Sequence, residues 1–109
     1  MVRNFSIQNT HGKIYFPGLT DLTDVDLERD IVIANHIEIY PDETITKPPI
    51  GMKLRKEFIA TLNNVSKPQS KSNMTDAEFE DSLRRKVEKN HGIHLSYDPT
   101  KFVWEFKVP

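Results

Sequence analysis

The chain has 109 residues, with 15 lysines and arginines against 16 aspartates and glutamates, which gives a net charge of −1. This length fits one compact domain, and the near-neutral charge excludes a strongly basic nucleic-acid-binding module as the first interpretation. The lack of cysteine excludes disulfides, thiolate zinc sites and thiol catalysis. No apolar run approaches the ~18 residues of a membrane span, and no signal peptide opens the chain, so we expect no direct membrane insertion.

Short runs of alternating or β-branched residues predict seven strands along the chain. They are Phe5–Ile7, Lys13–Phe16, Ile31–Ile33, Glu38–Tyr40, Phe58–Leu62, His94–Tyr97 and Phe102–Val108. We expect the second to end at Pro17-Gly18 and the fourth at Pro41-Asp42. The last run is the longest, and alternate side chains place its aromatic residues on one face, which we expect to be buried in an antiparallel sheet. That face consists of Phe102, Trp104, Phe106 and Val108.

One long helix is predicted between Thr75 and Gly92. Thr75 and Glu78 have capping-box spacing, acids occupy the first turns and bases the last, and Gly92 is a natural stop. The helix has a narrow apolar stripe, which we expect to cover the aromatic face of the last strand. The stripe consists of Phe79, Leu83 and Val87. A shorter helical turn is expected within residues 19–30. Its apolar anchors would be Leu22, Val25 and Leu27.

Charge is distributed unevenly along the chain. Residues 20–43 contain eight acids and one base, a sum of −7, whereas residues 47–71 contain six bases and one acid, a sum of +5. The first interpretation is two solvated loop regions of opposite sign. The second is a docking surface, because complementary charge steers association and fixes register.

The segment 41–55 contains Lys47-Pro48-Pro49-Ile50-Gly51. Two prolines fix φ near about −65° and remove two backbone donors, so we expect a stiff, extended loop. The loop is either a rigid connector or a preformed recognition loop that loses little entropy on binding. In the second case the partner-binding residues are Lys47, Pro48, Pro49, Ile50, Gly51, Met52, Lys53, Leu54 and Arg55.

Within this loop the apolar residues at alternate positions are expected to act as anchors for a partner. They are Ile50, Met52 and Leu54. Lys53, Arg55 and Lys56 would add exposed positive charge that steers association. The alternative is that Ile50 and Leu54 point inward and cap the sheet.

The sequence shows no catalytic or metal-binding constellation, and we expect no metal, cofactor or small-molecule ligand. His91 and His94 are three residues apart, but Gly92 interrupts the helix between them and no further ligand completes a zinc set. The glycines are isolated rather than gathered in a phosphate loop, and the serines lack a nucleophile elbow. Three aromatic residues near lysines would form a stacking platform for single-stranded nucleic acid. They are Trp104, Tyr97 and Tyr15. The residues alone thus predict a small α+β domain with an unusual loop.

Five motifs in order resemble those of one known family. They are Gly12–Phe16, the acidic residues 21–25, Glu38–Pro41, Lys47–Gly51 and Trp104–Val108. They resemble the C-terminal autopeptidase domain of the GLFG-type nucleoporins, which include the metazoan 98-kDa nucleoporin and its fungal relatives. The resemblance runs from about Phe5 to Val108. It implies a single domain over residues 1–109, truncated at both ends, with a mostly antiparallel sheet of about six strands flanked by one long and one short helix.

The resemblance also implies a function at the nuclear pore complex of the nuclear envelope. The domain would tether upstream Phe-Gly repeats to the pore scaffold for transport of protein and mRNA between nucleus and cytoplasm. Its expected partners are other nucleoporins, including the β-propeller nucleoporin of the cytoplasmic face, with RNA as a further candidate. We expect a monomer.

A second function implied by the resemblance is self-cleavage, because some members cut their own chain after a His-Phe pair with the following Ser as nucleophile. That motif would come after Pro109, so we expect no cleavage by residues 1–109 alone. The loop also departs from the family. After Ile50-Gly51 the family usually has Glu-Gly-Leu-Asn, whereas this chain has Met52–Arg55, in which Leu54 alone matches. The loop is therefore more basic than is usual.

Overall fold

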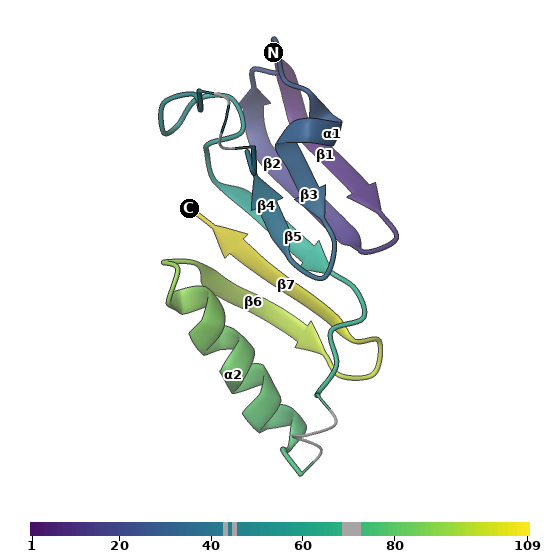
Figure 1. The fold of residues 1–109 in the computed structure, drawn as a ribbon. Helices are drawn as coiled ribbons and strands as arrows, with labels where there is room; N and C mark the ends of the chain where they lie inside the picture. The colour runs from purple at the N-terminus through teal and green to yellow at the C-terminus, as the bar shows by residue number, and fades with distance from the viewer. Residues whose placement is uncertain (43, 45, 69–72) are drawn as a thin grey trace.

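The computed structural model describes residues 1–109 except 43, 45 and 69–72. In this part of the chain, five antiparallel strands form the main sheet in the order β1-β2-β5-β7-β6, and β3 and β4 form a separate hairpin (Figure 1). The strands are β1 (Val2–Asn9), β2 (Gly12–Thr20), β3 (Ile31–Ile33), β4 (Ile37–Ile39), β5 (Phe58–Leu62), β6 (Ile93–Asp98) and β7 (Val103–Val108). The helices are α1 (Leu27–Asp30) and α2 (Asp76–Glu88). The α+β class is confirmed, with the strands divided between two sheets.

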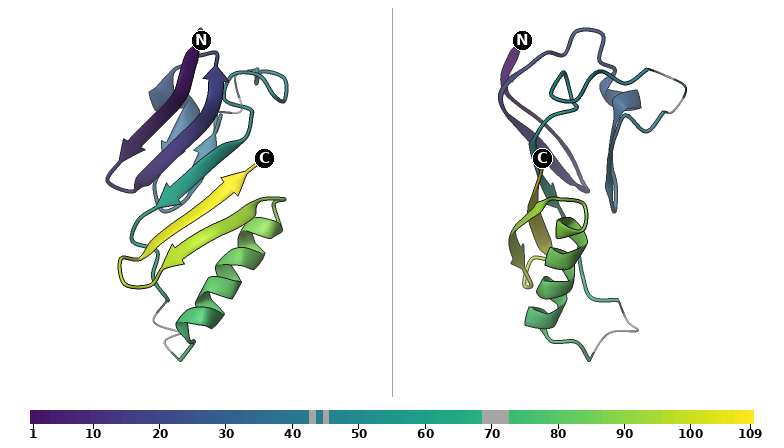
Figure 2. Two further views of the ribbon diagram at one scale, coloured as in Figure 1. Left: turned by 180° about the vertical axis from the view of Figure 1, so that it is seen from behind. Right: turned by 90° about the vertical axis from the view of Figure 1, so that its left-hand side faces the viewer.

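One face of the main sheet carries the core. The register pairs Leu62 with Trp104 and Ala60 with Phe106, which places these side chains on the same face of neighbouring strands. The β3-β4 hairpin and α2 both lie over this face, as the side view in Figure 2 shows. The predicted stripe of α2 is buried in the same core cluster as Trp104 and Phe106, so its burial is confirmed. Its residues are Phe79, Leu83 and Val87.

Phe102 does not belong to the buried face, which corrects the prediction for the last strand. It has φ of 59°, lies in a turn just before β7 and is 44% exposed. The cause is the turn that precedes it, in which the Asp98 carboxylate accepts from the backbone N–H groups of Thr100 and Lys101 at 2.9 and 3.1 Å. The turn includes residue 102, so the extended backbone with alternating side chains begins only at Val103.

Pro17-Gly18 does not end β2, which runs on to Thr20. The register with β1 shifts opposite Asn4, and the Asn4 side-chain oxygen accepts from the Gly18 N–H at 3.0 Å. Gly18 has φ of 79°, which a residue without Cβ adopts readily. Because β5 pairs with β2 only as far as Tyr15, the missing proline donor faces no third strand. A bulge thus accommodates the two residues that were expected to stop the strand.

The start of α2 is confirmed and its end is corrected. The Thr75 hydroxyl accepts from the Glu78 N–H at 3.1 Å, and the Glu78 carboxylate accepts from the Thr75 N–H, which completes the capping box. The helix ends at Glu88, and His91 rather than Gly92 takes the positive φ. Gly92 is needed for close approach, since a Cβ there would lie 2.6 Å from Val87 Cγ2. Within the described part of the chain, no helix is long and apolar enough to cross a membrane.

Candidate docking site

The loop between β4 and β5 is anchored at its base by a buried leucine. Leu54 is 1% exposed and belongs to the core. Its backbone N–H donates to the hydroxyl oxygen of Tyr40, which is itself buried at the end of β4, at 3.3 Å. Leu54 therefore supports the loop from below, as the alternative interpretation expected for this residue. The prediction that Leu54 is an exposed anchor for a partner is wrong.

The tip of the loop is folded into turns instead of being extended. Gly51 donates its N–H to the Arg55 carbonyl at 2.5 Å, and Met52 donates to the Pro49 carbonyl at 3.0 Å. Gly51 and Lys53 have φ of 92° and 50°. These left-handed residues reverse the chain direction, so the alternation expected of an extended strand is lost. Ile50 points outward at 82% exposure and Met52 is also exposed, whereas Leu54 points inward.

The loop's cations are engaged within the molecule, which corrects the expectation that they are fully exposed. Lys53 and Arg55 are half-buried, and their side chains donate to the Thr23 and Pro48 carbonyls. Lys56 donates to the Leu19 carbonyl at 2.6 Å, next to the bulge of β2. These bonds hold the loop against the acidic segment and the end of β2. Lys47, by contrast, is exposed.

The acidic and basic regions lie together rather than forming two separate surfaces. A cavity of about 550 Å³ is lined from both regions, with Asp24 and Asp30 on one side and Lys47 and Lys53 on the other. Asp30 is buried and pairs with Arg29 at 2.8 Å, and the Arg29 hydrogen bond lowers the pKa of this carboxyl. The acidic and basic segments of the sequence thus meet at one cavity. Glu43 and Lys71, which contribute to the two charge sums, lie outside the described residues.

A second cavity, of about 350 Å³, lies at the C-terminal end of β7. Pro109 lines it together with Lys47, Ile50 and Lys56. The loop predicted to bind a partner and the end of the last strand therefore share one surface. Sequence spacing alone could not show this proximity, because it depends on β5 and β7 being neighbours in the sheet.

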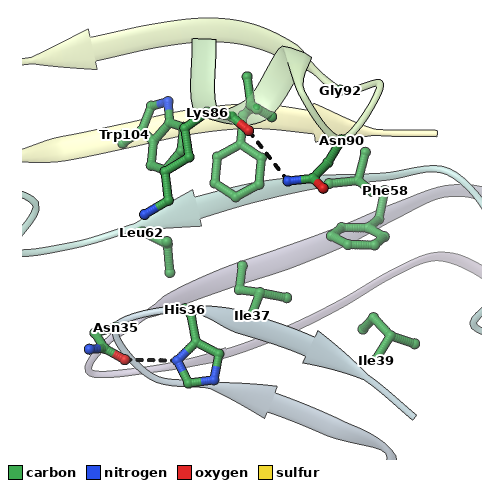
Figure 3. Close-up of a pocket in the computed structure, with 13 residues that line it drawn as sticks. Asn35, His36, Ile37, Ile39, Phe58, Leu62, Lys86, Asn90, Gly92 and Trp104 are labelled. Carbon is green, nitrogen blue, oxygen red and sulfur yellow. Dashed lines mark hydrogen bonds between the residues drawn. The ribbon is translucent and has the colours of Figure 1, made fainter. Parts of the chain in front are cut away.

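A groove of about 440 Å³ between the hairpin and α2 is a feature that the sequence did not reveal (Figure 3). Ile37 and Ile39 of β4 form one wall, and Lys86 of α2 and Asn90, in the turn after α2, lie on the other side. The apolar floor comes from the strands of the main sheet. It includes Phe58, Leu62, Trp104 and Phe106. Trp104 and Phe106 were correctly predicted to be buried, but the separation of the two covering elements was not predicted.

The proposed stacking platform is not formed. Trp104 and Tyr97 are buried, and Tyr15 is half-buried on β2. Phe79 packs edge-on against Tyr97 with ring centroids 5.3 Å apart, which leaves that face unavailable to a base. Among the residues that the structure describes, no group of three or more His, Asp or Glu is placed to hold a metal ion.

Residues 1–109 match the family described as Nucleoporin2: Nup98-96 autopeptidase S59. The chain belongs to this family. It is 32% identical to the Dictyostelium discoideum nuclear pore complex protein Nup98-Nup96 and 31% identical to Arabidopsis thaliana NUP98A, each over 98% of this chain. The aligned region is 6% and 11% of those two proteins, so the chain spans only a small part of the curated relatives it matches.

Solved structures have the same fold. The C-terminal domain of Candida glabrata NUP116 superposes with a TM-score of 0.78 at 23% identity, covering 98% of this chain and 75% of that one. A chain of the yeast Nup82-Nup159-Nup116 complex superposes with a TM-score of 0.78 at 19% identity, covering 98% and 80%. The predicted family and its location at the nuclear pore complex are confirmed. The role of residues 47–55 in binding a partner stays a prediction.

Proposed function

We propose that the chain is a docking domain that binds another nucleoporin through the tip of the β4-β5 loop. The observation that carries this proposal is an exposed apolar tip on a rigid base. Ile50 and Met52 project outward, while buried Leu54 fixes the position of the loop. A tip that is already ordered loses little conformational entropy when it binds, so its apolar area is used efficiently.

The exposed Lys47 adds a positive charge beside the apolar tip. A complementary acidic surface on the partner would raise the association rate, especially at low salt. One similar structure is a chain of the yeast Nup82-Nup159-Nup116 nucleoporin complex, which supports a nucleoporin as the partner class. In the longer protein, the domain would tether Phe-Gly repeats to the pore scaffold.

The test is calorimetric binding of the purified chain to the counterpart of the Nup82–Nup159 pair from the same organism. Replacing Ile50 and Met52 with alanine should weaken binding about tenfold or more without loss of stability. The matched control replaces Ile93 and Leu95, which are also exposed but lie on β6. If the tip variant and the control bound with equal affinity, the proposal that the loop tip is the docking site would be contradicted.

Charge reversal at Lys47 tests the electrostatic part of the proposal. Lys47→Glu should slow association at low salt and have a smaller effect at high salt. Lys53 and Arg55 are less suitable positions, since their side chains bind the Thr23 and Pro48 carbonyls and their reversal would disturb the loop itself.

Self-cleavage is a second candidate, favoured by the family's description as an autopeptidase. Pro109, after which the family's cleavage motif would follow, lies beside the polar side chains of Lys47 and Lys56. The experiment that distinguishes this candidate is the mass of a longer chain that includes any native residues after Pro109.

A further inference from the structure

His94 lies at the centre of a hydrogen-bond chain that runs from α2 through β6 to β7. Its side chain is only 4% exposed. Nε2 lies 2.8 Å from the Glu80 carboxylate on α2, and Nδ1 accepts a hydrogen bond from the Trp104 indole on β7 at 3.0 Å. The sequence had suggested His94 only as half of an incomplete metal pair. The structure gives it two protein partners on different elements.

The hydrogen bonds determine which nitrogen carries the proton. The indole N–H of Trp104 can donate but cannot accept, so the Nδ1 atom that faces it must be unprotonated. The proton of the neutral ring is then on Nε2 and is donated to Glu80. His94 is thus held as one neutral tautomer, selected by the network.

We propose that His94 is a proton-sensitive latch for the Trp104 indole and therefore for the floor of the groove. When Nδ1 takes up a proton from solvent, the ring becomes an imidazolium cation. Two N–H donors then face each other across the 3.0 Å contact, and the hydrogen bond to Trp104 is lost. A buried indole N–H without a partner is unfavourable, so the indole shifts. Because Trp104 lines the groove beside Leu62 and Phe106, the shift changes the shape of its floor (Figure 3).

The charged groups around His94 favour the loss of its bond to Trp104 and an ion pair with Glu80, rather than unfolding of the domain. Glu80 faces the ring from α2 and would form an ion pair with the imidazolium. Other charged groups near this side of α2 have partners of their own, since Asp76 pairs with Lys67 and Arg84 with Asp81. On the neighbouring strands, Glu105 and Lys107 alternate with Phe106 and project from the opposite face, and the Asp98 carboxylate is bound to the turn.

Trp104 is the only tryptophan of the chain, so its fluorescence and its indole N–H resonance report directly on this contact. The whole chain should be titrated from about pH 8 to about pH 5, the range in which histidine changes charge. We expect a single-proton transition in both signals. In His94→Asn the transition should be lost, because the amide oxygen takes the place of Nδ1 and still accepts from the indole but does not titrate. The matched control is His36→Asn at an exposed histidine, which should keep the transition.

Two results would overturn the proposal: no transition in the unmodified chain, or a transition that persists in His94→Asn. If that variant does not fold, the ring nitrogens of His94 in the unmodified chain can be observed by nitrogen NMR. Protonation of Nδ1 in step with the indole change would support the latch. An Nδ1 that already carries a proton at about pH 8 would contradict it.

Discussion

The hydroxyl oxygen of Tyr40 accepts a hydrogen bond from the backbone N–H of Leu54 at 3.3 Å, and this contact joins the end of the β3-β4 hairpin to the base of the β4-β5 loop. Tyr40 also donates its own backbone N–H to the Asp30 carbonyl at 2.7 Å. Burial raises the pKa of the Tyr40 phenol, so the hydroxyl is neutral at physiological pH. Through its backbone and its side chain, Tyr40 thus connects Asp30, the hairpin and the loop.

Replacing Tyr40 with Phe should destabilise the chain by about 1–3 kcal/mol, because the buried Leu54 N–H would lose its acceptor. Urea denaturation measures the change. Tyr15→Phe is the control, as its hydroxyl has no hydrogen-bond partner among the described residues. Equal losses in the two variants would show that the Tyr40–Leu54 contact contributes little.

Leu54 and Ile50 should respond in opposite ways to truncation, although they are four residues apart in one loop. Leu54→Ala removes a fully buried side chain and should cost about 2–5 kcal/mol of stability. Ile50→Ala should change stability by no more than about 0.5 kcal/mol, since its side chain is exposed. Thermal unfolding of both variants checks this pair. A large loss of stability in Ile50→Ala would mean that the tip packs against the domain in solution.

Asp30 should give part of the pH dependence of stability. Its hydrogen bond from Arg29 lowers its pKa in the folded state, so its stabilising contribution is full above the pKa of an unfolded aspartate and is lost as the pH falls through the lower, folded value. Asp30→Asn should therefore be less stable than the unmodified chain at neutral pH, and the difference should shrink in acid. Denaturation curves at several pH values measure it. A difference that does not depend on pH would contradict this assignment.

Trp104 should be among the largest single contributors to the core. Trp104→Ala should cost about 3–5 kcal/mol, because the indole packs against Phe106 with ring centroids 4.4 Å apart and its N–H is bound to His94. Phe102→Ala is a matched control, an aromatic residue of the same segment that is largely exposed. An unchanged melting temperature for Trp104→Ala would show that this face is not the core.

Local patterns predicted the elements of the fold well, whereas contacts between distant segments limited the prediction of the site. The capping box at Thr75 and the stripe of α2 involve residues three or four apart, and both are confirmed. Strand alternation likewise predicted Trp104 and Phe106 as core. The prediction that Phe102 is buried was wrong, because the turn at Asp98 extends to Phe102 and the alternation of the strand begins only after it.

The loop shows why a candidate site is harder to predict than the fold. Alternation treated Ile50 and Leu54 alike, but the positive φ angles at Gly51 and Lys53 turn one outward and the other inward. The tethers of Lys53 and Lys56 reach carbonyls 30 or more positions away in the sequence. Such contacts depend on the packing of β2 and the acidic segment, which no local pattern encodes.

Residues 1–109 by themselves are expected to hydrolyse none of their own peptide bonds. Within the described part of the chain, no serine hydroxyl is hydrogen-bonded to a histidine, and His94, the most buried histidine side chain, is bound to Glu80 and Trp104. A serine nucleophile without an adjacent base is weak at neutral pH. Intact mass spectrometry after prolonged incubation checks this expectation, and a shortened product would contradict it. The informative comparison is a longer chain that includes native residues after Pro109. Cleavage of that chain after a His-Phe pair, abolished when the following Ser is changed to Ala, would show that a loop carrying Lys53 and Arg55 is compatible with self-cleavage.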